Sequence, residues 1–190
     1  MRDGRCVVYA SGPANASARF AGVSAARADA ARGSWAQGEG DLVTYLNVFR
    51  AYKSNGENPQ WCNRNYLKHK VLARVKDIRK QLCFHLQRMR VPVVAADRDD
   101  RTAVAVRKAV TAGFFANAVQ SVAAGGYSSL RAGGCTRLDV HPSSVLFNSR
   151  PPHLVFHHVQ KTDKVWMLEV CTVEPDWLTE LAPHFYERRR

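Results

Sequence analysis

The spacing of hydrophobic residues changes at about residue 122, and this change limits the folds that the chain can adopt. Before that point, apolar residues recur every three or four positions, which is the period of an amphipathic helix. After it, short runs rich in β-branched and aromatic residues are separated by Gly-Gly and Pro-Pro pairs, a pattern typical of strands joined by turns. The sequence therefore predicts an α+β fold, in which a helical bundle fragment is followed by a small β-barrel and a short C-terminal helix.

The helical part is predicted to contain four helices. Apolar positions at helical spacing predict the first over 42–52, with Asp41 as its N-cap. Asn58-Pro59 has the form of an N-cap followed by a first helical residue, and predicts a short second helix. An apolar stripe over 71–89 predicts a long third helix that ends before Pro92, and 104–115 predicts a fourth helix capped by Asp99 or Asp100.

The second part is predicted to form four or five short strands, of which four can be placed. They are expected over 127–130, 135–141, 153–160 and 165–172, and a closing helical turn over 176–181. Phe156 and Trp166 fall in these strands and are candidates for stacking on bases, although an aromatic in a barrel strand is more often part of the core.

Positive charge is concentrated in one segment. The whole chain has 28 Lys and Arg against 16 Asp and Glu, and residues 64–90 contain nine cations and a single acid, Asp77. Such a field attracts polyanions by releasing counterions, so it favours nucleic acid as a partner first and an anionic membrane surface second. The alternative is an ordinary solvated helix face whose long side chains cover apolar surface. Because acids rarely interrupt the cations here, binding is the better interpretation.

Several classes of function lack the residues that they require. Phosphoryl transfer needs a Gly-Lys phosphate loop and an acidic pair for magnesium, but no lysine follows a glycine and no aspartate precedes a glutamate. Ser143 and Ser144 lie near His141 without the Gly-x-Ser-x-Gly elbow of a hydrolase. No apolar run approaches the roughly 20 residues of a membrane span. We therefore expect no enzymatic activity from the chain alone, no cofactor and no membrane partner.

Cysteine and histidine also give no sign of a metal centre. The five cysteines are widely spaced and form no Cys-x-x-Cys pair, so they are expected to be reduced thiols of an intracellular protein. His153, His157 and His158 are close in sequence, but neighbouring residues of a strand point to opposite faces. The sequence therefore predicts no metal site.

A set of short motifs occurs in one order along the chain. Near its end are His141-Pro142-Ser143-Ser144-Val145-Leu146-Phe147, Thr162-Asp163-Lys164 and the segment 174–186, and upstream are Gly40-Asp41, Leu46-Asn47-Val48, Trp61-Cys62, 78–82 and Gly113-Phe114-Phe115. Together they resemble the C-terminal region of DEAH-box ATP-dependent RNA helicases. In that family the region comprises the end of a helical ratchet, or helicase-associated, domain and an OB-like barrel.

The resemblance implies a domain organisation. Residues 1–22 would be a poorly ordered overhang, 23–102 a remnant of the ratchet domain and 103–190 the OB-like domain. The composition of 1–22, with a single acid and several Arg and Ser, would also suit a transit peptide. His158 and Leu168 stand where the family has a glutamate and an arginine, and we hypothesise that these positions face each other on neighbouring strands, so that losing both leaves no unpaired buried charge.

The function that the resemblance implies is that of an RNA-binding accessory module of a DEAH-box RNA helicase, without the ATP-binding motor lobes. Its expected partners are single-stranded RNA and either helicase motor lobes or activator proteins, and its expected location is nuclear, with mRNA splicing as the process. The RNA-binding residues carried over from the family are Lys70, Arg74 and Arg79 of the long helix, Arg107 of the next helix and Lys164 of the barrel. The alternative is a protein-interaction module that binds activators or partner domains without touching RNA.

Overall fold

The computed structural model describes residues 33, 35–36, 38–93, 101–131 and 137–187. The expected overhang and the caps Asp99 and Asp100 lie outside these residues. The chain divides into two compact units, one formed by Met1–Trp35 and Tyr45–Ala95 and the other by Ala36–Thr44 and Ala96–Arg190. The second unit therefore includes a short segment from the first quarter of the chain. None of the described helices is both long and apolar enough to cross a membrane.

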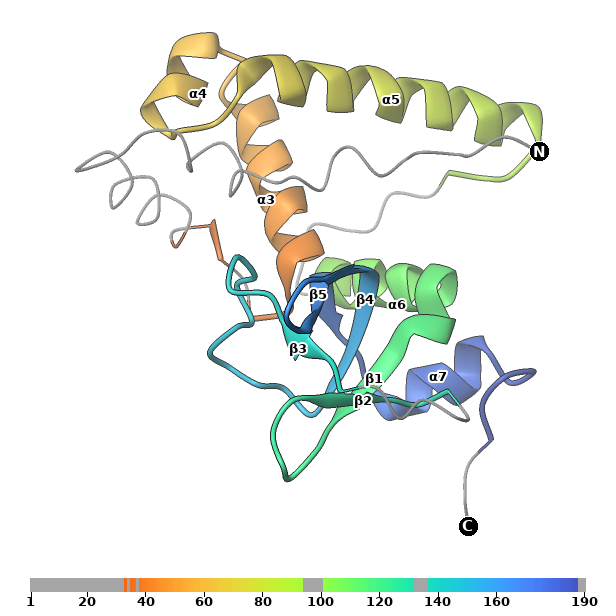
Figure 1. Ribbon diagram of the computed structural model, residues 1–190. Coiled ribbons are helices and arrows are strands. Elements are labelled where there is room, and N and C mark those ends of the chain that lie inside the picture. The colour runs from red at the N-terminus through yellow and green to blue at the C-terminus, as the bar shows by residue number, and fades with distance from the viewer. Residues whose placement is uncertain (1–32, 34, 37, 94–100, 132–136, 188–190) are drawn as a thin grey trace. The chain divides into compact units, whose positions relative to one another are not determined.

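The first unit is helical. It contains most of α3 (Asp41–Ser54), α4 (Pro59–Arg64) and α5 (His69–Arg88), which Figure 1 shows as consecutive helices. Asn58 accepts a hydrogen bond of 2.7 Å from the Gln60 amide and precedes Pro59, so the predicted start of the short helix is confirmed. The core of this unit is small and consists of Val48, Tyr52, Cys62 and Leu67, with Trp35, Phe49, Trp61 and Leu72 packed against it.

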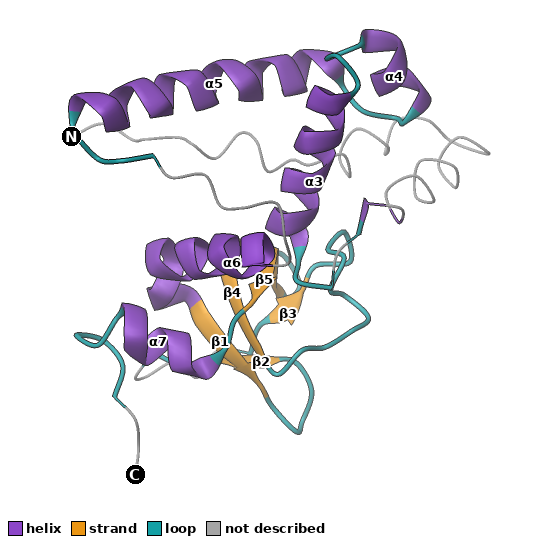
Figure 2. Ribbon diagram, turned by 180° about the vertical axis from the view of Figure 1, so that it is seen from behind, coloured by secondary structure: helices purple, strands orange, loops and turns teal. Residues whose placement is uncertain are grey.

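The second unit is built on a five-stranded mixed sheet (Figure 2). Its strands are β1 (Ala118–Ser121), β2 (Tyr127–Ser129), β3 (Asp139–Val140), β4 (His153–Lys161) and β5 (Val165–Thr172), in the order β2-β1-β4-β5-β3. All neighbours are antiparallel except β3 and β5, which are parallel. Strand β1 was not predicted, because it follows α6 and a single 3-10 turn with no glycine or proline to mark its start.

The sheet curls until its two edges meet. Tyr127 of β2 and Leu138, beside β3, exchange two backbone hydrogen bonds of 2.7 and 2.9 Å. One pair of residues therefore closes the outer strands on each other, as an OB-like barrel requires. The prediction of an α+β fold with an OB-like sheet is confirmed.

Both faces of the sheet are covered. The interior is filled by Val119, Tyr127, Leu138, Val140, Leu146, Leu154, Met167 and Val170. On the outside, Figures 1 and 2 show α6 (Arg101–Phe114) and α7 (Pro175–Leu181) beside the strands. A second cluster of Ala118, Val155, Val173 and Leu178 joins them to the sheet, with Phe114 and Trp177 packed against it. Along β4, Leu154 packs in the interior cluster and Val155 in the outer one, whereas along β5 Met167 and Val170 both face the interior because the left-handed Glu169 lies between them.

Gly40 and Asp41 attach the early segment to the sheet. Gly40 has a φ of 125° and pairs with Cys171, and a Cβ added to it would lie 2.4 Å from the Val170 carbonyl oxygen. The buried Asp41 carboxylate accepts hydrogen bonds from Ser144 Oγ (3.0 Å) and from the amides of Val145 (2.9 Å) and Val170 (3.0 Å). Asp41 was expected to cap its own helix, but its carboxylate instead joins a loop to β5.

Candidate nucleic-acid interface

A hollow of about 440 Å³ opens on the second unit where four segments meet. The segments are the β1–β2 hairpin, residues 137–140, the loop 147–150 and the turn between β4 and β5. Its charged and aromatic lining residues are Arg137, Asp139, Arg150, Lys164, Tyr127, Phe147 and Trp166. The fold therefore gathers three cations, one acid and three aromatic side chains from distant parts of the sequence.

The three cations are held in different ways. Arg137 lies 3.7 Å from Asp139 and packs against Gly125 and Gly126, whose left-handed backbone and missing Cβ atoms leave room for its guanidinium. Arg150 has a left-handed φ of 45° and is exposed. Lys164 is exposed in the tight turn after β4, and its Nζ lies 5.5 Å from the centre of the Trp166 ring. Of the three, Arg137 is the one with a carboxylate neighbour in the hollow.

Two of the aromatic side chains are accessible enough to meet a ligand. Phe147 is 41% exposed. Trp166 is half-buried, and its Nε1 donates a 3.2 Å hydrogen bond to Thr162 Oγ1, which fixes the ring beside Lys164. Tyr127 is buried, and its hydroxyl donates to the Pro151 carbonyl oxygen at 2.9 Å, so it supports the wall.

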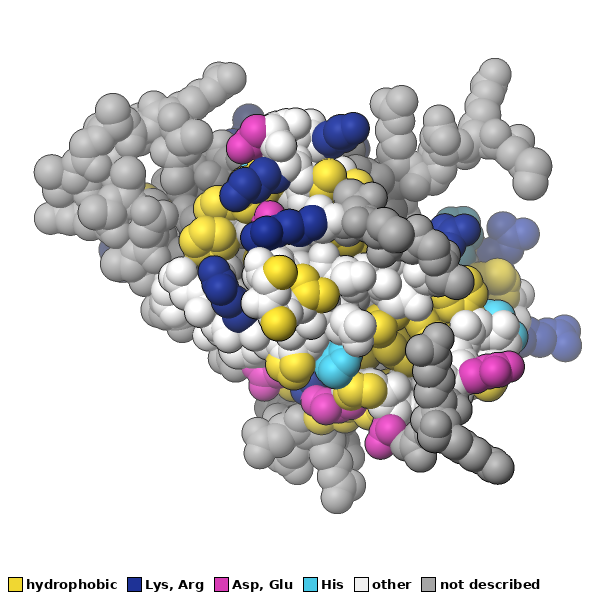
Figure 3. Space-filling view, turned by 60° about the horizontal axis from the view of Figure 1, so that its bottom comes forward, with side chains coloured by type: hydrophobic (Ala, Val, Ile, Leu, Met, Phe, Trp, Pro, Cys, Tyr) yellow, Lys and Arg dark blue, Asp and Glu magenta, His cyan; other side chains and the backbone are white. Residues whose placement is uncertain are grey.

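Figure 3 shows a face of the molecule on which several Lys and Arg side chains gather beside hydrophobic ones. Cations that track a phosphate backbone, together with rings on which bases stack, are the two elements of single-strand recognition by OB folds. The hollow supplies both, and its lysine and arginines can donate hydrogen bonds to phosphate oxygens, which position a strand without reading its sequence.

Of the five residues predicted to bind RNA, only Lys164 lies in this hollow. Lys70, Arg74 and Arg79 are exposed on α5. Lys70 and Arg74 are one turn apart, whereas nine residues place Arg79 roughly half a turn around the helix from Lys70. The predicted basic face of α5 is therefore split between two sides, and these three contacts stay predictions.

Arg107 is largely buried in the second unit. Its Nε donates to the Thr172 carbonyl oxygen at 3.0 Å, its terminal nitrogen lies 3.0 Å from Glu174, and its guanidinium lies 4.8 Å from the Trp177 ring centre. The side chain is 12% exposed. The structure thus gives Arg107 intramolecular partners, and an RNA contact at this residue stays a prediction.

Arg137, Phe147 and Arg150 were not predicted as site residues. Each stands beside a turn glycine, proline or loop rather than within a charged run, so local charge density does not mark them. The available signal was position: basic residues at strand ends next to Gly-Gly and Pro-Pro turns are placed at the rim of a small barrel.

His141 and Ser143, considered above as a hydrolase pair, form a local turn. His141 Nδ1 accepts a hydrogen bond from the Ser143 amide at 3.1 Å and lies 2.7 Å from Ser143 Oγ. The imidazole packs edge-on against Trp166, with ring centres 5.8 Å apart. The pair therefore stabilises the end of β3 and the wall of the hollow.

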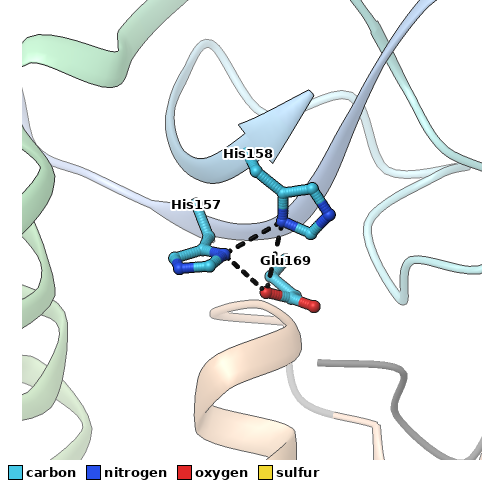
Figure 4. A group of neighbouring side chains, drawn as sticks. All are labelled: His157, His158 and Glu169. Atoms are coloured by element: carbon cyan, nitrogen blue, oxygen red, sulfur yellow. Dashed lines mark hydrogen bonds and ion pairs between the residues drawn. The ribbon is translucent and has the colours of Figure 1, made fainter. Parts of the chain in front are cut away.

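Three potential metal ligands converge between β4 and β5 (Figure 4). His157 Nδ1 lies 2.9 Å from His158 Nδ1 and 3.0 Å from Glu169 Oε2, and His158 Nδ1 lies 3.7 Å from the same oxygen. The expectation that the two histidines diverge is wrong, because their Nδ1 atoms lie 2.9 Å apart. Glu169, opposite them on β5, has a left-handed φ of 54°. His158 and Leu168 are direct cross-strand partners, as hypothesised.

Burial changes the acid–base properties of this group. It raises the pKa of Glu169 to about 7, and the negative charge of Asp41 adds to the shift. Burial also lowers the pKa of His157, and the neighbouring His158 lowers it further. Neutral forms of both side chains are therefore favoured, and the imidazole lone pair of His157 is available near neutral pH.

Comparison with known proteins is consistent with this architecture. Residues 106–186 match the family described as oligonucleotide/oligosaccharide-binding (OB)-fold, OB_NTP_bind. The chain is 37% identical over 151 residues to the Probable ATP-dependent RNA helicase DHX35 of Pongo abelii, covering 79% of this chain and 20% of that protein. With the Homo sapiens protein of the same name it is 35% identical over 151 residues, which cover 79% of this chain and 21% of that protein. The chain thus spans about a fifth of the length of these relatives.

Proposed function

We propose that the chain is an RNA-binding accessory module of a DEAH-box RNA helicase, because it is related to the C-terminal region of these helicases and residues 106–186 match an OB-fold family. The observation that carries the proposal is the hollow that Arg150 and Lys164 line together with the accessible rings of Phe147 and Trp166. Its ligand is single-stranded RNA, with phosphates on the cations and bases on the rings.

This arrangement supports binding without sequence preference. A lysine is a point charge, and a ring stacks on any base, so neither group reads the edge of a base. Lys70, Arg74 and Arg79 are proposed as additional phosphate contacts on α5. For Arg107 to contact a phosphate, its guanidinium would have to break its ion pair with Glu174.

The test is the salt dependence of binding to a fluorescently labelled single-stranded RNA. If Arg137, Arg150 and Lys164 each neutralise one phosphate, the hollow should contribute about −2 to the log–log slope, because each phosphate contributes roughly −0.7 for a single strand. Contacts on α5 would add to this value. The double variant Arg150→Ala/Lys164→Ala removes two contacts, so it should make the slope less negative by about 1.4.

Lys161→Ala is the matched control, since Lys161 is an exposed lysine at the end of β4 outside the lining of the hollow. It should leave the slope unchanged. Binding that does not respond to salt, or that Lys161→Ala weakens as much as the double variant, would contradict the proposed site. A flat response to salt would also favour the protein-interaction alternative.

We also infer that the module hydrolyses no ATP alone and works beside helicase motor lobes or activator proteins in the nucleus, in mRNA splicing. The sequence has no Gly-Lys phosphate loop and no Asp-Glu pair, which supports the first part. Equilibrium dialysis against labelled ATP should show no retention.

Co-purification with separately expressed motor lobes of a helicase tests whether the module works beside such lobes. Fluorescence microscopy of the tagged full chain tests its location.

A further inference from the structure

Three atoms with lone pairs point at one position between β4 and β5. They are the Nδ1 atoms of His157 and His158 and Oε2 of Glu169, separated by 2.9, 3.0 and 3.7 Å. A proton can bridge two of these atoms but not all three. The remaining oxygen of the carboxylate, Oε1, is buried without a hydrogen-bond partner among the described residues. The polar groups of the cluster are therefore incompletely satisfied by one another.

The backbone holds these side chains in place. Phe156 pairs with Val170 and His158 with Leu168, so His157 and Glu169 stand opposite each other between two regular pairs. At this position Glu169 has a left-handed φ of 54°, an unfavourable conformation for a residue with a Cβ. Asn117 Nδ2 donates to the carbonyl oxygens of Phe156 (3.0 Å) and His157 (3.3 Å), which further fixes β4 at the distortion.

The distances and the donor types suit a metal ion. Around a tetrahedral zinc, ligand atoms at about 2.0 to 2.2 Å lie roughly 3.4 Å from one another, and the three observed separations lie on either side of that value. Two imidazoles and one carboxylate form a known zinc ligand set that leaves a fourth position for water. The charge of Asp41, which acts on Glu169 from the start of α3, also favours a cation here.

We propose that His157, His158 and Glu169 bind one divalent transition-metal ion of the zinc class, which links β4 to β5 inside the OB-like unit. The negative charges of the Glu169 and Asp41 carboxylates would balance the positive charge of the ion. The partly exposed side of His158 would admit water as the fourth ligand. The site is separate from the lining of the RNA hollow, which contains none of the three ligands.

The experiment is a titration of the metal-free full chain with Co²⁺, a spectroscopic substitute for zinc. The expected result is saturation at one equivalent with the visible d–d absorption of a four-coordinate ion, lost on adding Zn²⁺. His158→Ala and Glu169→Gln should each weaken binding by about tenfold or more, since even indirect supports of a metal ligand contribute that much. Zn²⁺ should raise the Tm of the wild type more than that of either variant.

His153→Ala is the control, because His153 lies on the same strand outside the cluster. It should bind Co²⁺ like the wild type. His158 is 37% exposed, so its replacement should leave the fold intact, and circular dichroism verifies this for both ligand variants. Absence of one-equivalent binding, equal weakening by His153→Ala, or a thiolate-to-cobalt charge-transfer band, which would place the ion on a cysteine, would each overturn the proposal.

Discussion

Arg107 of α6 and Glu174, the residue before α7, form an ion pair of 3.0 Å. The same guanidinium reaches the end of β5 through a 3.0 Å hydrogen bond to the Thr172 carbonyl oxygen and lies over the Trp177 ring. One side chain thus joins two helices to the sheet of the second unit.

Arg107→Ala should destabilise the protein by about 2 kcal/mol in urea denaturation. Because Glu174 is 57% exposed, the ion pair itself contributes little. Most of the loss comes from the hydrogen bond to Thr172, about 1 kcal/mol, and from packing over Trp177, about 0.5 to 1 kcal/mol. Lys108→Ala, which removes the more exposed pair with Glu180, should cost less than about 1 kcal/mol. Equal losses in the two variants would contradict this account of Arg107.

Asp41→Ala should lower the free energy of unfolding by about 2 kcal/mol or more. The substitution leaves the buried amide of Val170 and the hydroxyl of Ser144 without their acceptor, and an unsatisfied buried donor costs roughly 1 to 3 kcal/mol. Glu187→Ala, at an exposed position, is the control and should change stability by less than about 0.5 kcal/mol. Guanidinium unfolding followed by tryptophan fluorescence measures both.

Gly40→Ala should cost about 3 kcal/mol, because it combines a strained φ with a collision. The new Cβ would lie 2.4 Å from the Val170 carbonyl oxygen and 2.8 Å from Cys171 Cα, both backbone atoms of β5. Gly56→Ala separates the two effects, since Gly56 has a φ of 65° but open space around it. That variant should lose only the conformational part, about 1 kcal/mol. Thermal unfolding of both proteins is the measurement, and equal Tm values would exclude the collision.

Stability of the metal-free protein should fall as pH rises from about 4.5 to about 7, where Glu169 titrates. Burial and the negative charge of Asp41 raise its folded pKa to about 7 from the ordinary glutamate value of 4.5. The folded state therefore binds more protons than the unfolded state in this window, and the contribution of Glu169 is lost as the carboxyl ionises. A tenfold change in an acid dissociation constant corresponds to about 1.4 kcal/mol, so the loss of stability is on the order of 3 kcal/mol.

Comparison with Glu169→Gln isolates this effect from the other groups with shifted pKa values around it, Asp41 and His157. The lowered pKa of His157 acts in the opposite direction, because the folded state then binds fewer protons just below pH 6.5. Urea denaturation at a series of pH values in the presence of a chelator should show the wild type losing stability relative to the variant towards pH 7. A constant difference between the two would contradict the raised pKa.

Phe147→Ala should weaken binding of single-stranded RNA by about 1 to 3 kcal/mol without changing the salt slope. The ring is exposed in the hollow and offers a stacking surface but no charge. Val159→Ala removes another exposed apolar side chain, outside the lining, and should have no effect. Fluorescence anisotropy at several salt concentrations measures both quantities, and a change of slope in Phe147→Ala would point to altered cation placement instead.

Local patterns predicted the elements whose signals are local. Asn58-Pro59 specified a helix start, and β5 was predicted with the bounds that it has, because turn residues flank a β-rich run. Strand β1 was missed where no turn residue precedes it. The cross-strand contact of His157 and His158 with Glu169 depends on one left-handed residue. Arg150 and Lys164 line the same hollow only because of the tertiary fold, and a count of charges along the sequence does not predict this.

The segment 36–44 has a consequence for synthesis of the chain. Asp41 is synthesised 129 residues before Val170, whose backbone amide donates a hydrogen bond to the Asp41 carboxylate. During elongation the early segment therefore cannot pair with β5 until β5 has been synthesised, whereas the residues of the helical unit are synthesised earlier. The second unit can assemble fully only after β5 has also been synthesised, so this half of the fold cannot reach its native state while the early segment is the only part available.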